Sequence, residues 1–168
     1  MTYIDIDNAL VGITKKMCEE CRVRLDAIPA ENPTEKKAAQ LEHGMYIFCG
    51  NAGELFNTGW EREKVIGIRK AFFHRVCAKY PRLDTAYQLL NSNEKLCFIA
   101  ALHAELYIRD QWIPKKESEL AAATAVNDAK NVFEIMVMIG AVKNMFTAWE
   151  AWRVENNVFP HMFEGDLK

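Results

Sequence analysis

Two pairs of residues in this sequence have the spacing of metal ligands. Cys18 and Cys21 stand three positions apart, as do His74 and Cys77. On helices, each pair would lie one turn apart on one face, and the four side chains together would make a Cys3His zinc site. Zinc fingers and ribbons instead carry their thiols on tight turns. We therefore expect buried free thiols and no bound metal, and keep a metal-binding regulator as an alternative.

A second group of polar residues interrupts apolar segments. Arg69 falls within the apolar stripe of residues 65–80, where a guanidinium is costly unless a carboxylate meets it. We expect Glu105 or Glu134 to be that carboxylate, since both lie in strongly apolar stretches. Together with His103, these residues predict a polar network inside the core. The alternative is that they line the pocket of a small-ligand-binding protein or an enzyme.

Sequence signatures of helical enzymes are missing from the chain. It contains no H-E-x-x-H, no E-x-x-H of a di-iron bundle, no G-x-S-x-G and no glycine-rich loop with a phosphate-binding lysine. No catalytic residue and no cofactor is predicted on this basis. We expect a non-enzymatic interaction or regulatory protein that acts by binding or masking a macromolecular partner.

Two groups of side chains are candidates for contacting that partner. One is a basic edge within residues 61–82, which hold seven Lys or Arg against two Glu, and the other is an aromatic group near the C-terminus, of the kind that interface cores favour. The candidate residues are Lys64, Arg75, Lys79, Arg82, Trp149, Trp152, Phe159 and Phe163. The alternatives are a solvated helix face and a C-terminal tail, residues 156–168, that folds back on the bundle. A protein is the favoured partner, and nucleic acid is the less favoured alternative, because no helix-turn-helix or zinc finger accompanies the basic edge.

Length and composition predict one soluble domain comprising residues 1–168. The chain is 50% hydrophobic and 26% charged, with a formal net charge of −2, which is typical of globular proteins. Its N-terminus lacks the basic and apolar regions of a secretory signal, and the apolar run of residues 135–142 is shorter than a membrane span. The five cysteines cannot all pair within the chain. We expect a cytoplasmic protein with no membrane partner.

Apolar residues recur with helical spacing along most of the chain. The pattern predicts helices at residues 5–28, 33–59, 61–80, 84–90, 94–111 and 116–155, the last of them interrupted near Asn127. Asp5 or Asp7 is the expected first N-cap, Asn91 and Glu94 form a capping box, and the fifth helix ends before Pro114. A short strand at residues 45–49 is the alternative to helix, because several glycines lie nearby.

Two segments are apolar nearly all round. We expect the helices at residues 94–111 and 131–155 to be central in a compact all-α bundle of five to seven helices. Two such segments exceed what one small bundle needs to bury. The sequence therefore predicts a homo-oligomer, with a dimer as the expected form.

Overall fold

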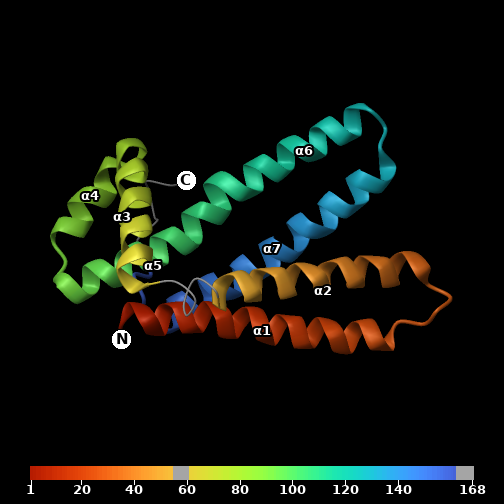
Figure 1. Ribbon diagram of the computed structural model, residues 1–168, viewed down its shortest axis with the longest axis horizontal. Coiled ribbons are helices and arrows are strands. Elements are labelled where there is room, and N and C mark those ends of the chain that lie inside the picture. The colour runs from red at the N-terminus through yellow and green to blue at the C-terminus, as the bar shows by residue number, and fades with distance from the viewer. Residues whose placement is uncertain (55–60, 162–168) are drawn as a thin grey trace.

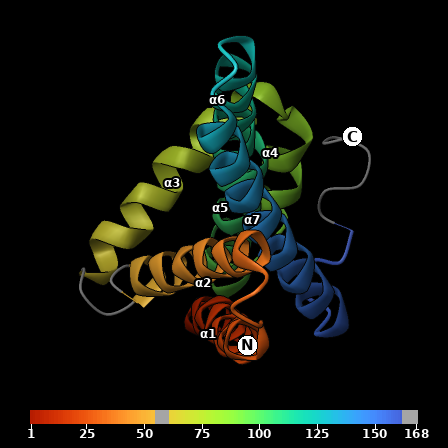
Figure 2. The same cartoon turned by 90° about the vertical axis from the view of Figure 1, so that its right-hand side faces the viewer.

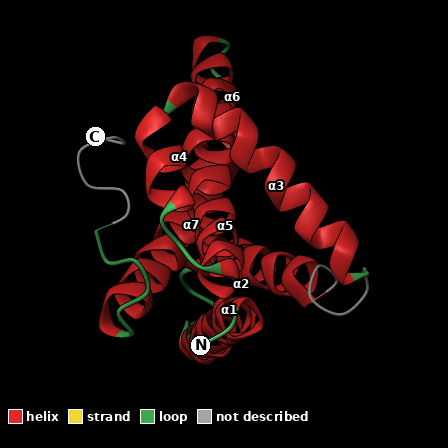
Figure 3. Cartoon of the chain, turned by 90° about the vertical axis from the view of Figure 1, so that its left-hand side faces the viewer, coloured by secondary structure: helices red, strands yellow, loops and turns green. Residues whose placement is uncertain are grey.

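The computed structural model describes residues 1–54 and 61–161, apart from the side chains of Ala52 and Glu54, and the regular structure in this part is entirely helical (Figure 3). The helices are α1 (Tyr3–Ala27), α2 (Pro33–Glu54), α3 (Arg62–Lys79), α4 (Pro81–Gln88), α5 (Ser92–Leu106), the π-helix η2 (Tyr107–Trp112), α6 (Ile113–Ala125) and α7 (Ala129–Glu155). The predicted all-α bundle is confirmed. Residues 45–49 belong to α2, so the strand alternative for them is wrong.

Two helical hairpins and a smaller group of helices make up the molecule. The α1–α2 hairpin and the α6–α7 hairpin diverge from each other, and α3 and α4 lie beside α5 at the other end (Figures 1 and 2). Helix α7 packs against α1 and α2 as well as α6, while α5 packs against α1, α3 and α4. The two hairpins therefore contact each other through α7, and the α1–α2 hairpin contacts the smaller group of helices through α5.

One part of the core lies where α1, α5 and α7 meet, and another lies between α3, α4 and α5. Ile6 of α1, Ala101 of α5 and Trp149 of α7 belong to one buried cluster. Eight residues of α5 are buried, which is typical of a helix that neighbours surround on all sides. Helix α7 buries one face, while Met136 on another face is exposed. Both segments predicted to be central thus contribute to the core, with α5 the more enclosed.

The helix ends follow capping chemistry, with one correction. Thr2 caps α1: its hydroxyl oxygen accepts a hydrogen bond from the Asp5 N–H, and the Asp5 carboxylate accepts one from the Thr2 N–H. The prediction that Asp5 or Asp7 is the N-cap is therefore wrong, because the helix begins before both. The Asn91–Glu94 capping box of α5 is confirmed. The expected end of α2 at Gly59 lies outside the described residues.

The fifth predicted helix continues past its expected end. Helix α5 passes into η2 and then into α6, with Pro114 in the first turn of α6. Proline lacks an amide hydrogen and clashes with the preceding turn of an α-helix, whereas the wider turn of a π-helix lets the chain pass it. The predicted break near Asn127 is confirmed: α6 ends at Ala125, and Asn127 has a φ of 56°.

Helix α7 has an unusually apolar composition. By length and hydropathy alone it could cross a membrane, unlike the other helices of the described residues, and 33% of its most apolar window is buried in the fold. The core helix of a globular protein passes the same test. The apolar character of α7 is thus accounted for in part by its packing against α1, α2 and α6.

Candidate functional site

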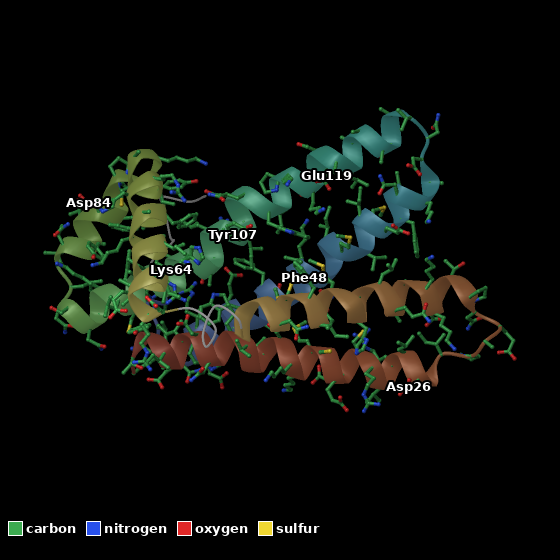
Figure 4. All side chains as sticks on the ribbon, in the orientation of Figure 1. Asp26, Phe48, Lys64, Asp84, Tyr107 and Glu119 are labelled. Carbon is green, nitrogen blue, oxygen red and sulfur yellow. The ribbon has the colours of Figure 1, made fainter. Side chains whose placement is uncertain are left out.

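A cavity of about 820 Å³ opens between the α1–α2 hairpin and the continuous run of α5, η2 and α6. Its volume lies within the range of about 300–1,000 Å³ that is usual for small-molecule sites. Phe48 of α2 and Tyr107 of η2 line it and are labelled in Figure 4. The apolar lining residues include Ile6, Leu10, Val11, Met45, Phe48, Ile108, Trp112, Val142 and Met145. Most of this wall is therefore suited to an apolar molecule.

The π-helix supplies a large part of the wall. Four of its six residues line the cavity: Tyr107, Ile108, Gln111 and Trp112. Single π-turns often occur at functional sites because they redirect side chains that an α-helix would point elsewhere. The Tyr80 hydroxyl donates a 2.9 Å hydrogen bond to Asp110, which joins the end of α3 to η2. The irregular turn is thus held in place from outside the cavity.

An ion pair between α1 and α3 forms another part of the wall. The guanidinium of Arg69 donates two hydrogen bonds to the Asp7 carboxylate, one of them 3.0 Å long from Nη1 to Oδ2. The side chains are 5% and 13% exposed. Burial raises the pKa of Asp7, and Arg69 offsets part of that rise. Arg69 therefore has the carboxylate partner that its buried position requires, and the positive charge of Arg69 compensates the negative charge of Asp7.

The predicted partners of Arg69 are wrong. Glu105 is fully buried and forms an ion pair with Arg153 of α7. The Arg153 guanidinium also donates a 2.6 Å hydrogen bond to the Phe159 carbonyl oxygen. Burial raises the pKa of Glu105 to about 7, although Arg153 opposes the rise. Glu134 is half-buried on the part of α7 that pairs with α6, and it does not line the cavity. Neither acid replaces Asp7, because each lies on a different part of the core.

His103 does lie in the cavity wall, as the pocket alternative expects. Its ring meets Phe72 edge-on, with the centroids 5.0 Å apart, and stacks on Tyr107 at 6.0 Å. Burial and the nearby guanidinium groups of Arg69 and Arg75 lower the pKa of His103 to about 4. The imidazole is therefore neutral near pH 7. Of the four predicted pocket residues, Arg69 and His103 are brought together at the cavity.

The four candidate zinc ligands do not converge. Cys18 and Cys21 pack with α2 and α7, whereas Cys77 packs beside α5 and His74 is exposed on α3. No cluster of three or more metal-binding side chains occurs in the described part of the chain. Burial raises the pKa of both Cys21 and Cys77 to about 11. These thiols are therefore protonated near neutral pH.

The basic edge is accessible. Lys64, Arg75, Lys79 and Arg82 are all exposed along α3 and α4, and Lys64 is labelled in Figure 4. The Lys79 ammonium lies 3.6 Å from Asp110, and the Arg75 guanidinium lies 5.7 Å from the centroid of the Phe72 ring. The edge can thus meet an acidic surface, although Lys79 already has an acidic neighbour.

The aromatic group contributes mainly to the core. Trp149 is 1% exposed, and Trp152 stacks on it with the centroids 5.4 Å apart. Phe159 packs edge-on against Phe98 at 5.3 Å. Trp149 is therefore wrongly placed among the partner-binding residues, because the bundle buries it. The tail folds back as far as residue 161, which is the alternative expected for it, and Phe163 lies outside the described residues.

Several cavity residues were not predicted. Asp7 and Thr14 lie on one face of α1 at a spacing of seven residues, a polar pair that the sequence could have revealed. Lys115 and Lys116 begin α6 and line the cavity, but nothing in the sequence distinguishes them from other lysines. No known protein family, curated protein or solved structure matches this chain. Its site therefore has to be interpreted from geometry and chemistry.

Proposed function

We propose that the protein binds a small, mainly apolar organic molecule in this cavity. The observation that carries the proposal is the cavity itself, about 820 Å³ in volume and lined largely by apolar side chains. Ligand sites commonly combine such a wall with a few polar groups that orient the ligand. Arg69, Asp7 and His103 are polar groups of this kind.

The chemistry of the wall favours binding over catalysis. Covalent catalysis needs a nucleophile that is hydrogen-bonded to a base, whereas the Thr14 hydroxyl in the cavity wall donates its hydrogen bond to the Leu10 carbonyl oxygen. Burial raises the pKa of Cys49, so its thiol is a weak nucleophile. The Asp7 carboxylate is already bonded to Arg69. Ligand binding explains the side chains of the cavity wall without assigning a chemical reaction to any of them.

A cavity-filling variant tests the proposal. Ala104 of α5 lines the cavity, whereas Ala121 is exposed on α6 and does not. Titration with the neutral dye nile red should show saturable binding to the wild type and to Ala121→Trp. Ala104→Trp should weaken binding by about tenfold or more, because the indole occupies the space of the ligand. Equal affinity in all three proteins, each shown to be folded by circular dichroism, would refute the proposal.

The second candidate function is that of an interaction protein, and the exposed basic edge favours it. Residues 61–82 hold seven basic and two acidic residues, although the whole chain carries a formal net charge of −2. An acidic protein surface fits this edge electrostatically. Replacing Lys64, Arg75 and Arg82 with Glu should abolish capture of such a partner from the native host. If the triple variant captures the same proteins as the wild type, this second function is excluded.

A further inference from the structure

The charges at the cavity suggest what kind of molecule occupies it. Resting on the proposed function, we propose that the ligand is an anionic amphiphile with a single hydrocarbon tail. The tail lies against the apolar wall, and Lys115 and Lys116 hold its acidic head group, a carboxylate or a phosphate ester, at the start of α6.

The charged residues of the wall are strongly biased toward positive charge. Asp7 is the acid among the described lining residues, and its carboxylate is already paired with Arg69. His103 is neutral near pH 7 because its pKa is about 4. The remaining charges of the lining are those of Lys115 and Lys116, and both are positive, although Lys116 also pairs with Glu119.

Both lysines line the cavity at the start of α6. They are neighbours in the first turn of α6, directly after η2. The Lys116 ammonium lies 5.9 Å from the centroid of the Trp112 ring and 2.8 Å from a Glu119 carboxylate oxygen, and the Lys116 side chain is 21% exposed. Lys115 is exposed, and its acidic neighbour is Glu119, one turn further along α6. An acidic head group adds a charge-assisted hydrogen bond to Lys115.

The wall itself suits a flexible tail. Its α1 side extends from Ile6 to Thr14, roughly 12 Å at 1.5 Å per residue. Met45 and Met145 face the cavity from α2 and α7, and methionine adapts its shape to irregular ligands more readily than branched side chains do. The Thr14 hydroxyl already donates a hydrogen bond to the Leu10 carbonyl oxygen. The α1 side of the wall is therefore better matched to hydrocarbon than to a second polar group.

Four ligands with the same dodecyl tail separate the effects of head group and tail. Dodecanoate, dodecyl phosphate, dodecanol and dodecyltrimethylammonium are titrated below their micelle concentrations against protein loaded with nile red. We expect the two anions to bind about tenfold more tightly than dodecanol, and the cation to bind more weakly than dodecanol. If the phosphate ester binds more tightly than dodecanoate, phospholipid-type head groups are the natural class; the reverse order assigns fatty acids.

A matched pair of variants tests the role of the two lysines. Lys115→Met with Lys116→Met removes both charges and keeps unbranched side chains only one atom shorter, so the preference for anions should disappear while dodecanol affinity stays unchanged. Lys36→Met with Lys37→Met changes another adjacent pair, on α2 and away from the cavity, and should leave the preference intact.

The outcomes that overturn the inference differ from those that overturn the proposed function. If dodecanol binds as tightly as both anions, or if the preference for anions survives loss of Lys115 and Lys116, the proposed head-group site is wrong although the cavity still binds ligands. If nile red binds in the cavity but no dodecyl compound displaces it, the proposal that the ligand has a single hydrocarbon tail is wrong. Failure of nile red and of all four compounds to bind overturns the proposed function itself.

Discussion

The Asp7–Arg69 ion pair joins α1 to α3 at the cavity wall, and its energetics follow from burial. Both charges have lost most of their water, and each is stabilised mainly by the other. Removing one partner leaves an uncompensated charge in a poorly solvated place, whereas removing both leaves two apolar or neutral side chains. The pair should therefore respond very differently to single and double substitution.

We predict that Arg69→Ala lowers the free energy of unfolding by about 3–5 kcal/mol, because Asp7 is left buried without its cation. The double change Arg69→Met with Asp7→Asn should cost much less. Urea denaturation of both variants measures these values. Arg62→Ala on the exposed face of α3 is the control, with an expected change within about 0.5 kcal/mol. Similar losses in the single and double variants would contradict the account of the pair.

His103 gives the protein a pH dependence whose sign can be stated. Its pKa falls from an ordinary 6.5 to about 4 in the folded protein. Between these values the unfolded chain binds a proton that the folded protein does not, so the contribution of His103 to stability is lost as the pH falls from 6.5 to 4. The slope from this residue approaches about 1.4 kcal/mol per pH unit.

Glu105 acts in the opposite direction, because its pKa is raised from 4.5 to about 7 and its contribution to stability is lost as the pH rises through that range. A variant is therefore needed to isolate His103. We predict that His103→Gln unfolds with less loss of stability between pH 6.5 and pH 4 than the wild type does. Chemical denaturation at several pH values measures the difference. Parallel pH profiles for the two proteins would show that His103 has the same pKa in the folded protein as in the unfolded chain.

The sequence predicted that Arg69 needs a buried carboxylate but not which one. A guanidinium within an apolar stripe requires such a partner on energetic grounds alone. The partner lies 62 positions away in the chain, and no local pattern specifies a contact of that range. Asp7 also has the residue type of a helix N-cap, and that local interpretation hid its role.

At the scale of elements, η2 determines how the α6–α7 hairpin leaves the core. The hydroxyl of Tyr80 and the ammonium of Lys79 both reach Asp110 from the end of α3. These contacts fix η2 to a neighbouring helix in addition to its own backbone hydrogen bonds. Losing them should destabilise the fold without removing any side chain that lines the cavity.

We predict that Tyr80→Phe lowers the free energy of unfolding by about 1 kcal/mol, since it removes one partly buried hydrogen bond to a carboxylate. Tyr87→Phe is the matched control, because the Tyr87 ring packs against Phe73 while its hydroxyl makes no hydrogen bond within the described residues. Urea denaturation distinguishes the two variants. Equal effects would mean that the hydrogen bond from the Tyr80 hydroxyl to Asp110 does not stabilise the contact between α3 and η2.

Helix periodicity predicted which segments are helical better than how they are joined. The capping box at Asn91 and the break near Asn127 depend on local residue types, and both were predictable. The junction at residues 107–112 was not, because Pro114 has the position of a helix stop. A π-turn carries no 3.6-residue signal of its own. The part of the cavity wall that η2 supplies could therefore not be inferred from the sequence, although Arg69 and His103 of the same wall were candidates for a pocket.

For the whole molecule, self-association remains a proposal. The tip of the α6–α7 hairpin exposes Val126 at 73% and Met136 at 58% of their surface, and a second copy of the chain could cover these side chains. All five cysteines are free, as is common in the reducing cytoplasm. Dimer formation, interaction with a macromolecular partner and a cytoplasmic location are therefore proposals for this protein.

We predict that light scattering at micromolar concentration gives twice the chain mass of 19.3 kDa. Met136→Glu should shift the protein to the monomer mass, because it places a charge in the apolar contact. Ala151→Glu, at another exposed position of α7, is the control and should remain a dimer. A wild-type mass of 19.3 kDa would refute the dimer.

Methyl NMR of protein labelled at methionine tests most directly whether the cavity binds a ligand. Met45 and Met145 line the cavity, whereas Met136 is exposed on α7 away from it, and Met→Leu variants assign the three signals. On addition of dodecanoate, we predict that the Met45 and Met145 methyl resonances shift along a saturable curve while that of Met136 stays in place. A shift of Met136 with no change at Met45 and Met145 would contradict binding in the cavity.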